Sequence, residues 1–433
     1  MARAKKETAL TPEERLQAAL VPDWEWPYKL PENWCWLKLV ESFDNHTDSK
    51  KKIKQKDYLV KGKLAVVDQG QELIGGYTND VEKSYSGALP IVIFGDHTRC
   101  IKFVDFPFAQ GADGVKVLRP KPFYLPKAFY YALQSVNIPN LGYRRHFPLF
   151  NKFSIPLPPF AEQQRIVDRI ESLFAKLDEA KEKAQAVVDS FETRKAAILH
   201  KAFTGELTAK WREEHDVRMD SWKVRTLDSV CSSIFDGDHM PPPKAESGIP
   251  FLVISNVNTG HLTFENTRFV PQEYYDTLSD TRKPQLGDVL YTLVGSFGIP
   301  VVVNSKRPFC FQRHMALLRP IDVSPQFLWY ILQTPEMYDK ASSIATGTAQ
   351  LTVPIKGLRA MTIPRPNIAE QIEIVRILDG FFAREQSAKE AAEAVLDQIN
   401  LMKKSILARA FRGELGTNDP SEESAVELLK QII

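Results

Sequence analysis

Apolar residues recur in alternating steps of three and four along two segments of the chain, near residues 160–200 and 368–408. This heptad pattern, sustained for about five repeats, predicts long helices that form a coiled coil. At ~1.5 Å of rise per residue, about 40 residues give each helix a length on the order of 60 Å. Arg194 and Glu385 interrupt the pattern. The seam residues are Ile166, Ile170, Leu173, Leu177, Val187 and Phe191 in the first segment and Ile374, Leu378, Phe381, Val395, Ile399 and Ile406 in the second.

The two segments are also copies of each other. Residues 154–207 align with residues 362–415 without a gap, and 25 of the 54 positions are identical. Each copy begins with prolines that end an extended segment, continues with Ala-Glu-Gln, and closes near Gly205 or Gly413, residues that suit a helix end. Two like helices most simply pair with each other in an antiparallel arrangement. The alternative is that each helix docks on its own neighbouring region or on another protein.

The regions outside the repeats read as mixed α/β. Short apolar runs predict strands at residues 64–70, 89–96, 115–118, 249–255, 288–295, 300–303 and 315–320, and helices at residues 127–136 and 325–333. The predicted fold class is therefore α/β, with two mixed α/β domains separated by two long helices that form an antiparallel coiled coil with an internal pseudo-two-fold relation. The expected boundaries are 1–153 for the first domain, 154–207 for the first helical repeat, 208–361 for the second domain, 362–416 for the second repeat and 417–433 for a C-terminal tail.

The composition of the chain excludes several classes of protein. The four cysteines show no Cys-x-x-Cys spacing, which argues against a structural zinc site and against a secreted disulfide scaffold. No apolar run is long and unbroken enough to cross a bilayer. We therefore expect a cytoplasmic protein that binds no metal. Because the net charge is only +2, any contact with nucleic acid must come from local basic patches.

Catalytic motifs are missing from the sequence. There is no phosphate-binding Gly-Lys-Ser/Thr loop, no dinucleotide Gly-x-Gly-x-x-Gly, no His-Glu-x-x-His and no Asp/Asn-Pro-Pro-Tyr. For a chain with two duplicated halves, this favours a binding protein over an enzyme.

Basic and amide side chains gather in a few turn-rich stretches. Residues 49–63 hold seven lysines against one aspartate, although a lysine run is also what an ordinary solvated surface carries. Lysines neutralise phosphates, whereas Arg, Gln and Asn can make paired hydrogen bonds to purine edges. The candidate DNA-binding residues are Lys50, Lys51, Lys52, Lys54, His97, Arg99, Arg144, Arg145, His146, His239, Gln312, Arg313, Thr348 and Gln350. His97 and His239 are equally compatible with structural roles in turns.

The order of variable region, Ile-Pro-x-Pro-x-x-x-Glu-Gln helix ending in Phe-x-Gly-Glu-Leu, variable region and second such helix resembles the specificity subunit of a type I restriction-modification enzyme. The resemblance covers nearly the whole chain. It includes Gly-Asp-His phrases at residues 95–97 and 237–239 and Gly-Asp-Val-Leu at residues 287–290. The family's fold implies two target-recognition domains, each reading half of a split DNA sequence, with the two helices as the spacer between them.

The resemblance also implies partners. Two modification subunits would bring S-adenosylmethionine and the methyltransferase site, and restriction subunits would bring ATP- and Mg-dependent cleavage, while this chain would bind no cofactor and perform no catalysis. Apolar residues that we expect to be exposed on the helices, Val167, Phe174, Val375 and Phe382, are candidates for the contact with modification subunits. Two alternatives stay open: a coiled-coil scaffold that binds proteins and not DNA, and a cryptic enzyme that acts on nucleic acid.

Overall fold

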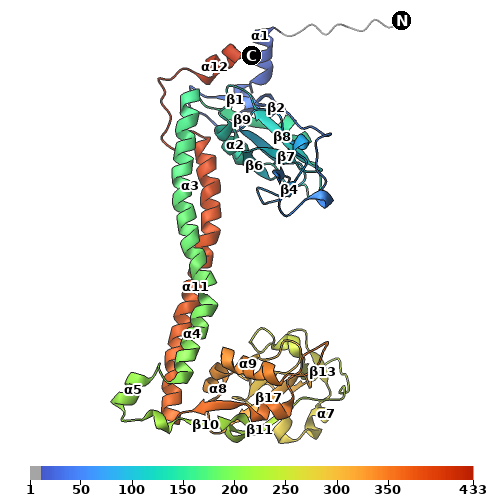
Figure 1. Ribbon diagram of the computed structural model, residues 1–433, viewed down its shortest axis with the longest axis vertical. Coiled ribbons are helices and arrows are strands. Elements are labelled where there is room, and N and C mark those ends of the chain that lie inside the picture. The colour runs from blue at the N-terminus through green and yellow to red at the C-terminus, as the bar shows by residue number, and fades with distance from the viewer. Residues whose placement is uncertain (1–10, 433) are drawn as a thin grey trace, which may run out of the picture. The chain divides into compact units, whose positions relative to one another are not determined.

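The computed structural model describes residues 11–432, which form two compact units (Figure 1). Unit 1 contains the described residues up to Ala184 and those from Ala394 onward, and unit 2 is Gln185–Glu393. The first ten residues of the expected first domain and the last residue of the expected tail lie outside the described residues. None of the helices within residues 11–432 is long and apolar enough to cross a membrane.

Unit 1 holds a mixed α/β domain. Its four-stranded antiparallel sheet has the order β2-β8-β5-β6, its three-stranded sheet the order β4-β3-β7, and β1 pairs with β9. The elements are α1 (Pro12–Ala19), β1 (Cys35–Lys38), β2 (Phe43–Asn45), β3 (Leu64–Val67), β4 (Gly76–Thr78), β5 (Ile91–Gly95), β6 (Ile101–Val104), β7 (Phe108–Gln110), β8 (Val115–Pro120), α2 (Pro126–Ser135), β9 (Ser154–Leu157) and α12 (Ala425–Ile432), with most of α3 (Phe160–Asp189) and the end of α11 (Ile368–Ala410).

Unit 2 repeats this topology. Its sheets have the orders β11-β17-β14-β15 and β13-β12-β16, and β10 pairs with β18, so each strand has a counterpart in unit 1. The elements are α4 (Phe191–Thr204), α5 (Ala209–Glu214), β10 (Lys223–Thr226), α6 (Leu227–Val230), β11 (Cys231–Asp236), β12 (Ile249–Leu252), β13 (Arg268–Val270), α7 (Gln272–Thr277), β14 (Val289–Thr292), β15 (Pro300–Val302), β16 (Cys310–Phe311), β17 (Met315–Pro320), α8 (Pro325–Ile331), α9 (Pro335–Ile344), α10 (Ile355–Ala360) and β18 (Thr362–Arg365). The predicted strands and helices are confirmed in both units.

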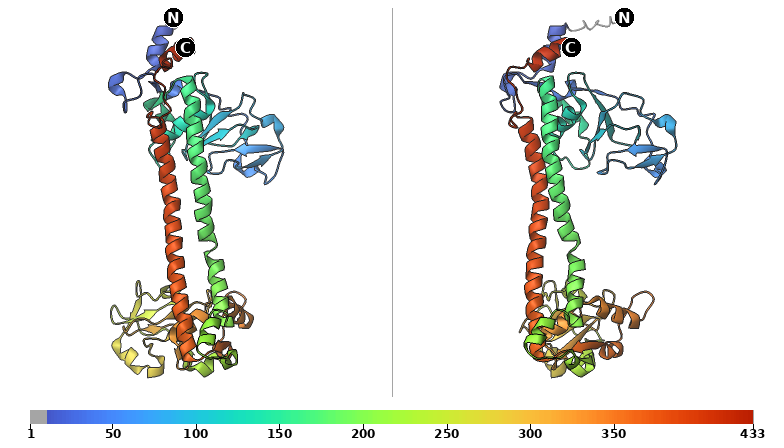
Figure 2. Two further views of the ribbon diagram at one scale, coloured as in Figure 1. Left: turned by 90° about the vertical axis from the view of Figure 1, so that its left-hand side faces the viewer. Right: turned by 60° about the vertical axis from the view of Figure 1, so that its left-hand side comes forward.

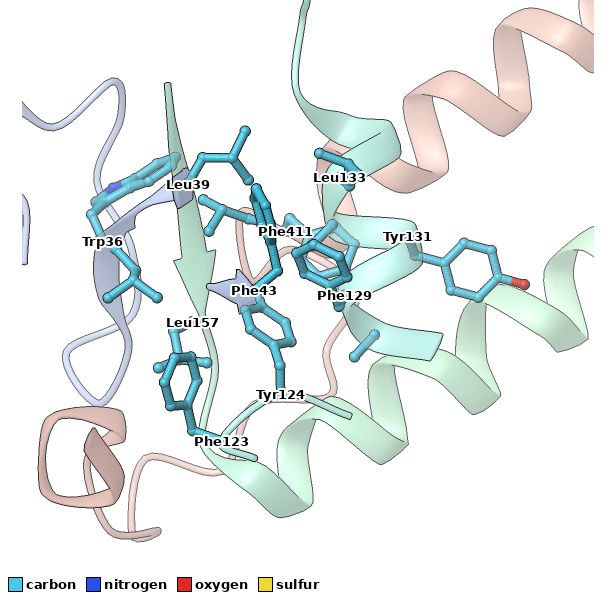
Figure 3. Close-up of a cluster of buried hydrophobic side chains, with 14 of the residues drawn as sticks. Trp36, Leu39, Phe43, Phe123, Tyr124, Phe129, Tyr131, Leu133, Leu157 and Phe411 are labelled. Carbon is cyan, nitrogen blue, oxygen red and sulfur yellow. The ribbon is translucent and has the colours of Figure 1, made fainter. Parts of the chain in front are cut away.

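The main core of unit 1 lies between the β1–β9 pair and α2 (Figure 3). Phe129 of α2 and Leu157 of β9 are fully buried there, and so is Phe411, which directly follows the long helix α11. Fully burying a side chain of this size contributes about 1.5–3 kcal/mol. The end of the second helical repeat is thus part of the core of the first domain, although more than 250 residues separate them in sequence.

The first long helix is broken, where the heptad pattern predicts one continuous helix. It runs as α3 to Asp189 and resumes as α4 at Phe191. At Ser190 between them, the backbone N–H still donates to the carbonyl of Ala186, whereas the carbonyl of Val187 accepts from the Ser190 hydroxyl at 3.4 Å and from the Arg194 guanidinium at 3.2 Å. Side-chain donors that compete for helix carbonyls interrupt the i to i−4 ladder. The second copy has Gln398 at the equivalent position, and α11 is continuous for 43 residues.

Helix pairing is antiparallel within each unit, as predicted. In unit 2, Lys389 lies over the ring of Phe191 at 5.0 Å, and Arg194 forms an ion pair with Glu385 at 2.7 Å. Later residues of α4 therefore meet earlier residues of α11. The two polar residues that interrupt the heptad pattern are each other's partners, so the interruptions compensate one another.

In unit 1 the end of α11 lies beside α3 (Figure 2), and the contacts again run in opposite directions. Arg165 near the start of α3 donates to the carbonyl of Thr417, and Asp178 further along α3 pairs with Lys403. The predicted seam residues are buried or partly buried except Val395, which is 40% exposed.

The repeated glutamine attaches each long helix to its own domain. Gln163 is buried, accepts a hydrogen bond from the backbone N–H of Leu125 at 2.7 Å and donates to the carbonyl of Phe123. Gln371 likewise accepts from the N–H of Ser324 at 2.9 Å. Leu125 and Ser324 are the N-cap residues of α2 and α8. Equivalent glutamines therefore fix the starts of the equivalent helices α2 and α8.

The repeated glutamate holds the segment that follows the other helical copy. Glu162 has no exposed surface and accepts a hydrogen bond from the hydroxyl of Thr417 at 2.6 Å and from Arg165 at 2.7 Å. Arg165 also makes a two-pronged pair with Glu422. Burial raises the pKa of Glu162 above its usual range, opposed by the hydrogen bonds from Thr417 and Arg165.

Glu370 plays this part in unit 2. It is also fully buried, and its carboxylate accepts from the Thr208 hydroxyl at 2.8 Å, from Arg212 at 2.6 Å and from the Trp222 indole N–H at 2.9 Å. A buried carboxylate needs such partners. The Ala-Glu-Gln repeat is thus explained by one joint that is built once in each unit.

The apolar helix residues that we expected to be exposed face their own domains instead. Val167 is 3% exposed in the core of unit 1, and Phe174 packs edge-on against Tyr131 with ring centroids 5.9 Å apart. Val375 is partly buried on the core of unit 2, and Phe382 stacks on a tyrosine of α8. The expectation of exposure was wrong because these helices lie against the domains as well as against each other.

Candidate nucleic-acid interface

Four loops of unit 2 form one continuous surface, which we call the unit 2 loop surface. It comprises residues 237–243 after β11, 293–299 between β14 and β15, 312–314 between β16 and β17, and 345–354 between α9 and α10. Backbone hydrogen bonds join the loops: Arg313 N donates to Asp238 O, Leu293 N to His314 O, and Gly295 N to Leu351 O.

Gly237 is required where the first loop crosses the third. A Cβ at this position would lie 2.2 Å from the carbonyl oxygen of Phe311, a contact that backbone atoms cannot relieve by rotation. Close passage of the two backbones brings His239 next to Arg313, and both line the same two cavities. The Gly-Asp-His phrase of unit 2 therefore has a steric reason for its glycine.

The cavities on either side of His239 and Arg313 differ in chemistry. One, of about 280 Å³, is lined by these two residues, Gln312 and the apolar Phe251. The other, of about 410 Å³, is lined by His239, Arg313 and Gln350. His239 is held by Asp236 at 2.7 Å and remains exposed, and Arg313 is exposed as well. Four of the candidate residues in unit 2 are thus brought together, and Thr348 is exposed on the same loop as Gln350.

Unit 1 has the equivalent loops at the equivalent strands, the unit 1 loop surface. It comprises residues 46–54 after β2, 96–100 between β5 and β6, 111–114 between β7 and β8, and 136–146 after α2. The joining bonds are equivalent too: Asp96 N donates to Gly114 O at 2.6 Å, and His146 N donates to Asp96 O at 2.8 Å.

The two Gly-Asp-His phrases are not equivalent, however. In unit 1 the phrase lies in the hairpin between β5 and β6, whereas in unit 2 it follows β11, the counterpart of β2. The counterpart of residues 237–239 is therefore the segment after Asn45. The sequence match between the phrases does not reflect a shared position in the fold.

The candidate residues of unit 1 fall into three environments. Arg144 and Arg145 are exposed, and neither makes an ion pair or a side-chain hydrogen bond within residues 11–432. His146 is fully buried, with its Nδ1 bonded to Asp96 O at 2.9 Å and its Nε2 accepting from the N–H of Leu141 at 3.1 Å, so it holds the loop and does not face solvent. Arg99 donates to Ile138 O and lines a groove beside α2.

The first four lysines of the lysine-rich stretch lie on the first loop of the unit 1 loop surface. Lys50 and Lys54 are exposed, while Lys51 and Lys52 are partly buried. The ammonium of Lys51 donates to the carbonyl of Ser84 at 3.2 Å, which leaves it less free than its neighbours.

Sequence reasoning missed Tyr143, whose side chain is 86% exposed and whose ring stacks on His97 with centroids 4.8 Å apart and planes 14° apart. It also missed Arg268 and Lys244, which line the smaller unit 2 cavity. The position of Tyr143 between Gly142 and two arginines was a usable signal, whereas Arg268 reaches the cavity only through strand pairing.

The described residues also include side chains of the kinds that bind metal ions. Within residues 11–432, no group of three or more His, Cys, Asp or Glu side chains is placed to hold a metal ion. Cys310 lies near Asp238, but burial raises the pKa of its thiol to about 12, so the thiol stays protonated near neutral pH. The surfaces offer exposed charges, amides and an aromatic ring, which suit binding.

Comparison with known proteins identifies the class. The family model of the type I restriction modification DNA specificity domain matches residues 31–188 and 219–396. The chain belongs to this family. It is 28% identical over 305 residues to the specificity subunit of the type I restriction enzyme EcoKI from Escherichia coli K12, a match that covers 65% of this chain and 64% of that one. The chain thus spans somewhat less than two thirds of the length of this curated relative.

Solved structures support the fold. A chain from a study of complex assembly and conformational transition in a type I R-M system matches with a TM-score of 0.64 at 22% identity, covering 90% of this chain and all of that one. The HsdS subunit from Thermoanaerobacter tengcongensis matches with a TM-score of 0.57 at 22% identity and the same coverage.

Proposed function

We propose that this protein is the DNA-binding specificity subunit of a type I restriction-modification complex and that it reads a two-part target. Membership of the specificity-domain family carries this proposal. Each loop surface reads one half of the target, and partner subunits methylate or cleave the DNA that the chain selects.

The contrast between joints and loops supports the division of labour. The joints around Glu162 and Glu370 both pair the buried glutamate with a threonine hydroxyl and an arginine. The loop surfaces, by contrast, share strand positions but present different side chains, including Arg144 and Arg145 in unit 1 and Gln312 and Arg313 in unit 2. A common framework with differing loops is what two readers of different sequences require.

The exposed and partly exposed side chains of the loop surfaces suit the reading of base edges. Arginine can donate two hydrogen bonds to guanine, and glutamine can both donate to and accept from adenine. Arg313, Gln312 and Gln350 are therefore proposed base contacts, as are Arg144 and Arg145. The exposed lysines Lys50 and Lys54 and, less freely, Lys51 and Lys52 would contact phosphates, which set affinity but not sequence. His97, Arg99, His239 and Thr348 complete the proposed DNA-contacting set, and His146 is proposed to position its loop.

The chemistry is proposed to reside in the partners. Two modification subunits would supply S-adenosylmethionine, and restriction subunits would supply ATP- and Mg-dependent cleavage, with the assembly in the cytoplasm. The proposed domain division keeps residues 1–153 and 208–361 as target-recognition domains, 154–207 and 362–416 as the helical spacer, and 417–433 as the tail. In this assembly the present chain is non-catalytic.

The experiment that tests this proposal is a domain exchange followed by mapping of methylated adenines in cells that also express the partner genes. Residues 227–361 would be replaced with those of another family member. These boundaries retain Thr208, Arg212, Trp222 and the β10–β18 pair, so the joint at Glu370 is preserved. One half of the methylated sequence should change and the other should persist. A change in both halves would refute independent reading, and a methylated sequence without two parts would refute the proposed function.

A further inference from the structure

The loop that follows α2 carries an aromatic ring that faces outward and stacks on a neighbouring side chain. Tyr143 is 86% exposed, yet one face of its ring lies flat on the imidazole of His97. Gly142 before it has a φ of 68°, a left-handed conformation that glycine adopts without strain. An exposed tyrosine on a flexible loop would sample many rotamers, but this one has a fixed partner.

Both halves of the stack are anchored to the domain. The backbone N–H of His97 donates to Gln69 Oε1 at 3.1 Å. On the other side, buried His146 closes the tyrosine loop through the N–H of Leu141 and the carbonyl of Asp96. Little conformational entropy remains to be lost when the outer face of the Tyr143 ring makes a contact.

The chemistry around the ring indicates what covers it. Arg144 and Arg145 follow directly, are exposed, and have no ion-pair partner within the described part of the chain, so the ring sits beside two positive charges. In double-stranded DNA the phosphates supply the matching charge, and the flat apolar surfaces are the faces of base pairs. Those faces become accessible only where a base step opens, as it does around inserted apolar side chains in other DNA-binding proteins.

We propose that the Tyr143–His97 stack is a wedge that packs against a base-pair face in the half-site read by unit 1 and opens one base step there. This inference rests on the proposed function and adds an unstacking step to it. The equivalent loop of unit 2, residues 345–354, has no aromatic residue. The stacked rings of unit 2, Phe297 and Tyr338, are 7% and 50% exposed, so the mostly exposed ring at this loop is a feature of unit 1.

The test begins with selection of duplexes from a library with two randomised blocks, using the full-length chain. The enriched duplex is then synthesised with 2-aminopurine at successive positions of each half-site, because the fluorescence of this base rises when it loses its stacking neighbours. With the wild-type chain, fluorescence should rise at one step of the half-site read by unit 1. Tyr143→Phe should keep the rise, and Tyr143→Ala should abolish it and weaken binding by at least about fivefold.

Trp24→Ala is the matched control, because Trp24 is 85% exposed in the same unit but lies outside the loop surface, and this variant should behave as wild type. Hydrogen exchange of unit 1 that matches the wild type would show that the domain carrying Tyr143→Ala is folded. A rise that persists in Tyr143→Ala, or no Tyr143-dependent rise at any position, would overturn the wedge while leaving the proposed function intact. If the wild-type chain enriched no sequence, the proposed function would fall and the wedge with it.

Discussion

Replacing Glu370 by alanine should be among the most damaging single changes in unit 2. Its carboxylate is fully buried and holds Thr208, Arg212 and Trp222 at 2.6–2.9 Å. The Arg212 side chain is only 11% exposed, so loss of Glu370 leaves a buried cation with the carbonyl of Gly205 as its main remaining acceptor. Breaking a buried ion pair on one side costs about 3–5 kcal/mol.

The equivalent change in unit 1 should cost less, although the sequence repeat makes the two glutamates look alike. The side chain of Arg165 is 38% exposed and keeps a second carboxylate, Glu422, after Glu162 is removed. Solvent and the second partner compensate for most of the lost attraction, so Glu162→Ala should destabilise unit 1 by about 1–2 kcal/mol. The difference between the two variants is thus expected to be about 2 kcal/mol.

Hydrogen exchange read separately for each unit is the suitable assay, because a chain with two units need not unfold in one step. Glu373→Ala provides the control, since Glu373 is on the same helix but pairs only with the 70% exposed Arg376, and exposed pairs of this spacing contribute about 0.5 kcal/mol or less. Equal losses of protection in Glu370→Ala and Glu162→Ala, or a larger loss in the latter, would refute the reasoning from burial.

Three further outcomes are expected. Arg313→Ala should weaken DNA binding by about 1–3 kcal/mol and relax the base preference at one position of the target, whereas Arg313→Lys should restore the affinity but not the base preference. Gel-shift titration on matched and mismatched duplexes distinguishes these outcomes. Equal weakening on all duplexes would indicate a phosphate contact. Four residues inserted after both Ala184 and Glu393 should add about 6 Å of helix and lengthen the unread gap by about 1–2 base pairs without altering either half-site in the methylome. Folding raises the pKa of Glu162, so the wild type should lose stability relative to Glu162→Gln as the pH rises from the unfolded-state pKa of Glu162 to its folded-state pKa. Hydrogen exchange from pH 4 to 7 measures the stability of unit 1 in both proteins. Stability curves that stay parallel over this range would contradict the prediction.

The sequence predicted those structural elements that a single physical rule determines. Short apolar runs located the strands and the heptad pattern located the long helices, because burial dictates both patterns. The break at Ser190 was not predictable, since it depends on the particular donors that Arg194 and Ser190 offer to nearby carbonyls. The same limit applies to Val167 and Phe174, where the heptad pattern identifies a helix but not which second surface covers it.

The candidate site was predictable in outline only. In unit 2, His239 and Arg313 come from separate turns and line the same two cavities, a proximity that the sequence did not indicate. His146, by contrast, looked identical to its arginine neighbours in sequence and proves to be the buried residue that fixes their loop. Composition gives the chemistry of a loop, but hydrogen bonds across loops decide which side chain faces outward.

The turn between β7 and β8 and its counterpart between β16 and β17 carry side chains of opposite charge. In unit 1 the turn is Gly-Ala-Asp-Gly at residues 111–114, and in unit 2 the turn carries Arg313 and His314. Exposed Asp113 repels phosphates and can only accept, which suits the amino group of cytosine, whereas Arg313 can only donate, which suits guanine. Equivalent positions of one topology thus carry opposite hydrogen-bonding capacity. We therefore expect the two turns to prefer different bases on the strand that each contacts, so the two halves of the target should differ in sequence.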